Sequence, residues 1–183
     1  MKRNIIAGGL ASLAAAVAVG SAMMVGPAHA APAGTTATPV KLADATTCTV
    51  TATSTCQVLT PDVSTNKILR QKISAPNILQ KWDFIQLTSD PNTNLVLKSN
   101  QTISGKPACL DLSSDAVRSQ QVSGSALILR KCDATNSQRW TRISFSNGKF
   151  ELQNKLSLMR LAFNGQHMVQ IGPGVSGLRM IKV

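Results

Sequence analysis

Cys109-Leu110-Asp111 is followed by Ile128-Leu129-Arg130-Lys131-Cys132 and then by Gln138-Arg139-Trp140, and this stretch gives the strongest indication of the fold. A cysteine opens a short apolar run, and an acidic residue comes two positions later. A second apolar run ends in another cysteine, and a Gln-x-Trp tripeptide closes the unit. Short apolar runs separated by Asn, Gly, Ser and Asp are typical of strands joined by turns. The stretch therefore predicts a small β unit.

The same unit occurs earlier in the chain. Cys56-Gln57-Val58-Leu59, Ile68-Leu69-Arg70 and Gln80-Lys81-Trp82 follow one another in the same order. The identical Ile-Leu-Arg ends 12 residues before the Trp in this copy and 10 residues before it in the other copy. Repeated short β units that cannot cover their own apolar faces predict one closed body built from several copies.

A third and fainter copy lies in the C-terminal part of the chain. Residues 155–161 align with residues 106–112, and Met168-Val169-Gln170-Ile171 takes the place of the Ile-Leu-Arg strand. Leu178-Arg179-Met180 then takes the place of Gln-x-Trp. No helical apolar pattern persists over three turns beyond the N-terminal segment. We therefore expect a nearly all-β domain with threefold pseudosymmetry.

The arrangement resembles the ricin B-type lectins, whose repeat carries the Gln-x-Trp motif. The resemblance covers residues 50–183 and implies a β-trefoil with three pseudo-repeats, the third degenerate. It implies carbohydrate binding rather than catalysis. We expect Trp82 and Trp140 to share one buried core, with the Gln of each motif bonded to nearby backbone, because a large aromatic is most often a core residue.

The N-terminus has the pattern of an export signal. Lys2 and Arg3 precede an acid-free apolar run over residues 5–26, and Ala28-His29-Ala30 follows it. This predicts a signal peptide over residues 1–30, cleaved after Ala30, and a secreted protein. The alternative is an uncleaved membrane anchor, for which the run is long enough. We expect residues 31–47 to be a flexible leader and residues 48–183 to form the trefoil domain.

The charge balance favours an anionic partner. The predicted signal contains two of the 19 basic residues and none of the eight acidic ones, so 17 basic and eight acidic residues remain, a net charge of +9. This charge indicates either a well-dispersed surface or attraction to anionic glycans or lipid headgroups. Nucleic acid is the least expected partner of an exported protein. The Lys and Arg residues are scattered, so no basic tail is predicted.

The cysteine content agrees with export. Four cysteines in an oxidising compartment suggest two disulfides, with three connectivities to choose from. The repeat alignment that the lectin resemblance implies favours Cys109–Cys132, and with it Cys48–Cys56. The alternative of a zinc site lacks support, because the chain has no Cys-x-x-Cys and the expected mature chain has one histidine, His167.

The resemblance implies a sugar site in the central copy. Asp111 matches the family's acidic ligand, Gln138 matches the motif glutamine, and Ser137 stands where Asn is usual. Arg130 stands near the usual aromatic and, with Lys131, could donate to a carboxylate or sulfate. The competing interpretation of Asp111 is a carboxylate bonded to local backbone amides.

The other two copies lack the acid. Our alignment places Val58 in the position of Asp111 in the first copy and Arg160 in the third. The sequence therefore predicts at most one complete sugar site.

These observations favour a non-catalytic, secreted, lectin-like module for cell-surface or acidic glycans. The chain contains no Gly-x-Ser-x-Gly and no phosphate-binding loop, so neither an enzyme nor a cofactor is predicted. The alternative is a delivery subunit of a multi-subunit bacterial toxin, similar to the lectin-like subunits of cytolethal distending toxin. Its partner would then be a catalytic toxin subunit or another protein.

Overall fold

The computed structural model describes residues 39–48, 54–112, 123–172 and 177–182. Twelve strands and two short 3-10 helices form within these ranges, and the all-β class expected from the sequence is confirmed. The elements are β1 (Val40–Asp44), β2 (Gln57–Pro61), β3 (Ile68–Lys72), η1 (Ile78–Gln80), β4 (Trp82–Gln86), β5 (Leu95–Ile103), β6 (Lys106–Leu112), β7 (Leu127–Lys131), η2 (Asn136–Gln138), β8 (Trp140–Ser144), β9 (Phe150–Asn154), β10 (Arg160–Asn164), β11 (His167–Ile171) and β12 (Leu178–Lys182).

Six strands close into a ring. β1, β4, β5, β8, β9 and β12 pair in that order, and β12 pairs with β1 again. Ladders of five residue pairs (β4–β5, β8–β9 and β12–β1) alternate with contacts of a single residue pair (β1–β4, β5–β8 and β9–β12). Closure removes the free edges that an open sheet would expose.

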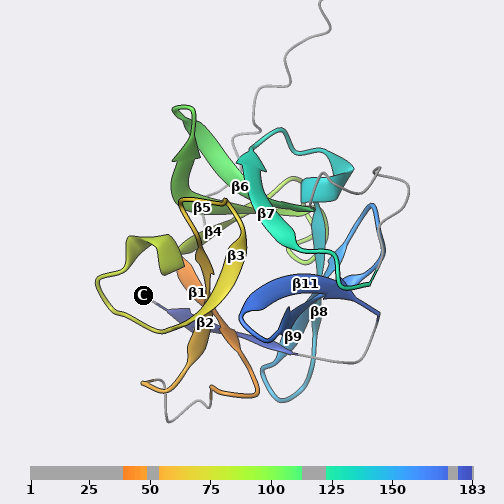
Figure 1. Cartoon of the computed structure of the whole chain (residues 1–183). Helices are drawn as coiled ribbons and strands as arrows, with labels where there is room; N and C mark the ends of the chain where they lie inside the picture. The colour runs from red at the N-terminus through yellow and green to blue at the C-terminus, as the bar shows by residue number, and fades with distance from the viewer. Residues whose placement is uncertain (1–38, 49–53, 113–122, 173–176, 183) are drawn as a thin grey trace, which may run out of the picture.

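The other six strands form three hairpins, β2–β3, β6–β7 and β10–β11, each paired over five residues. Figure 1 shows β3, β7 and β11 grouped around the middle of the view. One residue pair joins each hairpin to the next, and the three pairs are Lys67 with Ile128, Ala126 with Val169, and His167 with Leu69. The hairpins thus support one another at one end of the ring.

The interior of the ring is apolar and contains both tryptophans. Trp82 and Trp140 have no exposed surface, and they belong to the same core cluster. Each indole N–H donates to a backbone carbonyl, at 3.2 Å to Leu59 and 3.5 Å to Leu110. The expectation of a shared tryptophan core is confirmed.

The third position of this core is occupied by Leu178 rather than by Met180, which corrects the sequence alignment. Leu178 is buried and begins β12, as the two tryptophans begin β4 and β8. The three residues have matching ring contacts, because single residue pairs join Trp82 with Val40, Trp140 with Leu95 and Leu178 with Phe150.

The expected leader over residues 31–47 is wrong for its last part. β1 pairs with β12 over five residues, and its Leu42 and Ala43 are fully buried. Without this strand the ring would stay open between β4 and β12. The folded domain therefore begins no later than Val40 rather than at Cys48. Residues 1–38, which include the predicted signal peptide, lie outside the described residues.

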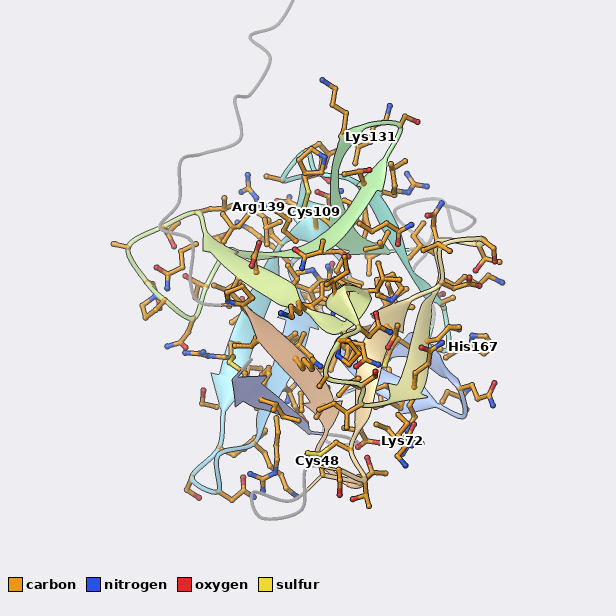
Figure 2. All side chains as sticks on the ribbon, turned by 90° about the vertical axis from the view of Figure 1, so that its left-hand side faces the viewer. Cys48, Lys72, Cys109, Lys131, Arg139 and His167 are labelled. Carbon is orange, nitrogen blue, oxygen red and sulfur yellow. A yellow bond between two sulfur atoms is a disulfide. The ribbon has the colours of Figure 1, made fainter. Side chains whose placement is uncertain are left out.

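Both disulfides form as expected. Cys109–Cys132 links β6 to the end of β7, and Cys48–Cys56 links the segment after β1 to the start of β2. A crosslink stabilises the fold chiefly by restricting the unfolded chain. Figure 2 shows Cys48 and Cys109 in separate parts of the molecule, so the two crosslinks restrict different regions.

Candidate functional site

The outer face of the β6–β7 hairpin carries the residues that the sequence singled out. Asp111 is opposite Ile128 in the ladder, and Cys109 is opposite Arg130. Directly opposed residues in an antiparallel ladder, and residues two apart in one strand, project to the same face. Asp111, Ile128 and Arg130 therefore share one face, while the intervening Leu110 and Leu129 point into the core.

Asp111 is buried, with 2% of the residue's surface exposed. Its Oδ1 accepts a hydrogen bond from Leu112 N at 2.7 Å, and its Oδ2 accepts one from Gln138 Nε2 at 3.0 Å. No cation of the described residues forms an ion pair with it. A carboxylate offers about four acceptor positions, and donors of the described residues occupy two of them.

Gln138 holds the chain between β7 and η2 in place through hydrogen bonds to its backbone. Its Oε1 accepts from the backbone N–H groups of Asp133 (3.0 Å) and Ala134 (3.2 Å), and its Nε2 donates to the carbonyl of Lys131 (2.8 Å) as well as to Asp111. The backbone role that we expected for the motif glutamine is confirmed.

Gln80, the glutamine of the first Gln-x-Trp motif, makes two of the backbone hydrogen bonds that Gln138 makes. Its Oε1 accepts from Ser74 N at 2.8 Å, and its Nε2 donates to the Lys72 carbonyl at 2.9 Å. Lys72 and Lys131 end equivalent strands, β3 and β7. Each glutamine therefore stabilises the equivalent turn of its own copy. Of the two, Gln138 is the one that also bonds to a carboxylate.

Ser137 is buried and hydrogen-bonded within the fold, whereas the side chain of Arg130 is half-buried and free to meet a ligand. Ser137 is buried, its Oγ lies 3.0 Å from Thr135 Oγ1, and its carbonyl accepts from Asn154 Nδ2 at 2.8 Å. Arg130 is half-buried, and no described residue hydrogen-bonds or ion-pairs with its side chain. The structure thus joins Asp111 to Gln138 directly, with Ser137 next to them in η2. Arg130 and Ile128 are the accessible members of the face.

The ladders also correct which residues replace Asp111 in the other hairpins. Ala43 is opposite Val58, as Lys98 is opposite Cys109 and Gln153 is opposite Arg160. Val58 and Arg160 are therefore equivalent to Cys109. Two residues further on, Thr60 and Ala162 are equivalent to Asp111. In the first copy the sequence alignment was shifted because Cys56 bonds to Cys48, outside the hairpin. The hairpin face still has its acid in the central copy alone.

A pocket lies at the other end of the ring, and sequence reasoning missed it. This pocket of about 300 Å³ is lined by Arg142, Ser144, Phe145, Lys149, Phe150 and Met180. A signal for it was present in the sequence. Trp82-x-Phe84 and Trp140-x-Arg142 place an apolar residue and a cation at matching strand positions.

The described residues show neither a metal-binding cluster nor a membrane-spanning helix. They contain no group of three His, Cys, Asp or Glu side chains placed to hold a metal ion. No helix within them is long and apolar enough to cross a bilayer.

The chain matches no protein-family model and no curated protein sequence. Among solved structures it is similar to ThreeFoil, a designed threefold-symmetric protein, with a TM-score of 0.60 and 14% identity over 79% of this chain and 99% of ThreeFoil. The Polyporus squamosus lectin bound to Neu5Acα2-6Galβ1-4GlcNAc has a TM-score of 0.60 and 13% identity, over 79% of this chain and 49% of the lectin.

Two further structures widen the range of activities. SeviL bound to the asialo-GM1 saccharide has a TM-score of 0.54 and 12% identity, over 79% of this chain and 97% of SeviL. An exo-β-1,3-galactanase from Clostridium thermocellum has a TM-score of 0.57 and 13% identity, over 80% of this chain and 30% of the enzyme. At this level of identity the likeness establishes a shared β-trefoil fold, and function has to be argued from the site.

Proposed function

We propose that this protein is a non-catalytic carbohydrate-binding module of the ricin B type, with three pseudo-repeats of which the third is degenerate. The ring contacts and hairpin bridges that recur three times support the repeat assignment. The fold that the chain shares with two glycan-bound lectins supports the ligand class.

The Asp111–Gln138 hydrogen bond carries the proposal. Burying a carboxylate without a cation is costly. The fold does not require this acid, because the equivalent strand positions hold Thr60 and Ala162. The acceptor positions of Asp111 that the described residues leave open suit a hydroxyl donor, and vicinal sugar hydroxyls are such donors.

Access to Asp111 needs side-chain movement at the hairpin face. Asp111 is covered, whereas Arg130 is half-exposed on the same face and Lys131 is exposed. Figure 2 shows Lys131 extending away from the body of the molecule. Rotamer changes at binding surfaces are common. A bound sugar would contact Arg130 first, and an acidic sugar would gain a charge-assisted hydrogen bond from it.

A glycan array tests the proposal with the whole oxidised chain. We expect wild type to bind a restricted set of glycans and Asp111→Asn to lose about tenfold or more of its affinity, because a polar ligand group is left unpaired. Asp133→Asn is the matched control, because Asp133 is an exposed turn acid near the site whose Oδ1 accepts from Thr135. Folded protein that binds no glycan, or that binds equally with Asn at position 111, contradicts the proposal.

We propose further that residues 1–30 direct export and that the mature protein is secreted. The two disulfides support an oxidising compartment. The N-terminal sequence of protein recovered from the culture medium tests this, and an N-terminus upstream of Ala31 would contradict the assigned cleavage. No feature of the described residues favours the alternative of a toxin delivery subunit over a lectin.

A further inference from the structure

The core-facing side of the ring strands carries a half-buried cation, Arg142, at a position that is otherwise apolar. Strands β4, β8 and β12 each place the residue two positions after their first on the core-facing side. These residues are Phe84, Arg142 and Met180. Arg142 is opposite Leu152, which is fully buried. A guanidinium in this layer costs desolvation energy that Phe84 and Met180 do not.

One neutral residue holds this guanidinium. Asn92, in the turn between β4 and β5, accepts from Arg142 Nε at 2.9 Å and from Nη2 at 2.7 Å through its Oδ1. The Asn92 carbonyl also accepts from Arg142 N at 2.7 Å. No carboxylate of the described residues pairs with Arg142, and no other described residue accepts from its side chain. The charge is therefore fixed in direction but not neutralised.

The pocket that Arg142 lines is also basic at its rim. Lys149 lines the pocket, and no described residue accepts a hydrogen bond from its Nζ. Arg179 donates from Nη1 to the Asn147 carbonyl at 3.2 Å, beside the same turn. The nearest acid in the sequence, Glu151, is buried and forms an ion pair with Arg160. No lining residue is acidic.

The pocket also offers an apolar surface. Phe145 is 44% exposed in the turn between β8 and β9, and Phe150 and Met180 line the interior. Gly148 closes this turn at φ +73°, a conformation that glycine adopts without strain. The turn lies at the opposite end of the ring from the hairpins, because each hairpin connects the end of one ring strand to the start of the next, and the β8–β9 turn joins the other ends.

We propose that this pocket, hereafter the mouth pocket, is a second binding site that takes the carboxylate or sulfate group of an acidic sugar. Arg142 and Lys149 hold the anion, and the sugar ring packs against Phe145. A charge-assisted bond is stronger than a neutral one, so the site selects an anion over an uncharged sugar. That the anion is carried on a sugar rests on the proposed function, whereas the selection of an anion rests on Arg142 and Lys149.

Amide NMR titrations of the whole oxidised chain test the proposal. The probes are methyl β-D-glucuronide for the carboxylate, glucose 6-sulfate for the sulfate, methyl β-D-glucoside as the neutral sugar and benzoate as an anion without a sugar ring. We expect at least one acidic sugar to shift the amides of Phe145, Gly148 and Lys149. We expect it to bind about tenfold or more tightly than the glucoside. The stronger of the two acidic probes identifies the source of the anion.

Two substitutions of equal charge separate the site from general attraction. Arg142→Met introduces the residue found at the equivalent position 180 and should reduce acidic-sugar affinity about tenfold or more. Lys155→Met is the control, because Lys155 directly follows β9 and donates to Asn94 at 2.9 Å but does not line the pocket. It should change affinity by less than about twofold, as a distant exposed charge is screened.

The outcomes that overturn the proposal are distinct from those that overturn hairpin binding. Acidic and neutral sugars binding alike, shifts confined to the β6–β7 hairpin, or equal losses in Arg142→Met and Lys155→Met would each overturn the mouth pocket. Benzoate binding as tightly as the acidic sugars would overturn its assignment to sugars. Asp111→Asn should leave the titrations of the mouth pocket unchanged. If only the hairpin binds sugar, Asp111→Asn weakens binding and Arg142→Met does not. If only the mouth pocket binds sugar, the two variants show the reverse.

Discussion

Gln138 donates a hydrogen bond from Nε2 to Oδ2 of Asp111 at 3.0 Å, across 27 residues of sequence. The bond joins η2 to the outer face of the β6–β7 hairpin. The same glutamine holds the turn before η2 through the backbone of Lys131, Asp133 and Ala134. One side chain therefore stabilises the turn and positions the carboxylate that we assign to ligand binding.

Gln138→Leu should lower the free energy of unfolding by about 2–4 kcal/mol. It removes the side-chain partner of two partly buried backbone N–H groups, of the Lys131 carbonyl and of one buried carboxylate oxygen. Gln80→Leu should cost less, since Gln80 has no carboxylate partner. Urea unfolding of the oxidised proteins measures both. Equal losses in the two variants would show that the bond to Asp111 contributes nothing to stability.

The tryptophan core gives a second prediction. Trp140→Leu copies the residue at the third equivalent position, Leu178, into a site shaped for an indole. We expect a loss of about 2 kcal/mol or more, because the smaller side chain leaves a cavity and Leu110 loses a hydrogen-bond donor. Ile78→Ala is the control, since Ile78 is largely exposed and its truncation should cost less than about 0.5 kcal/mol. Denaturant midpoints that shift alike in the two variants would contradict this role of Trp140.

The sequence was sufficient for the class of fold because Gln-x-Trp marks a local structure. Gln138 and Gln80 hold equivalent turns, and the tryptophan after each is buried in the ring. Such a motif can be recognised in a sequence because one short segment contains both the glutamine that holds the turn and the tryptophan that fills the core. The third copy was misaligned by two residues, since Leu178 fills the core position without a motif to mark it.

The sequence did not reveal β1 or the mouth pocket, for two different reasons. Residues 40–44 read Val-Lys-Leu-Ala-Asp, too short and too polar to distinguish from the leader before them. Their burial depends on β12, more than 130 residues away. Arg142 looked like one of many scattered cations. Its core-facing position follows only from the register that places Trp140 inside the ring.

Leu158 gives a third prediction, based on backbone conformation. It adopts φ +59° and is 66% exposed, so its side chain contributes little burial while its backbone lies in the left-handed region. That region costs an L-residue about 1–2 kcal/mol, which glycine would not pay. Glycine, however, loses more conformational freedom on folding, and this loss cancels part of the gain. Leu158→Gly should therefore raise stability by about 0.5 kcal/mol.

The matched control for this substitution is Leu158→Ala, which removes the side chain but keeps the strain. Thermal unfolding of the three proteins at one pH compares them directly. Alanine that stabilises the protein as much as glycine does would assign the effect to the exposed side chain instead of to the backbone.

Lys41 gives a prediction about pH. Its side chain is buried in β1, and its Nζ donates to the Ser74 carbonyl at 2.6 Å. Burial, with a smaller contribution from the nearby charge of Lys81, lowers the pKa of Lys41 below its usual value of 10.5. Between the lowered pKa and 10.5 the unfolded chain binds more protons than the folded chain at this residue. The stability contribution of Lys41 therefore rises with pH across that window, and its penalty is fully present below it.

Lys41→Met should remove this penalty, because an apolar side chain of similar length needs no desolvated charge. The Ser74 carbonyl keeps a donor in Asn77 N. We expect Lys41→Met to be at least as stable as wild type at pH 7, and the difference between the two to shrink as the pH is raised toward 10.5. Urea unfolding at a series of pH values measures that difference. A difference that grows with pH would mean that the folded state binds the Lys41 proton more tightly than the unfolded chain does, the reverse of what burial of this charge requires.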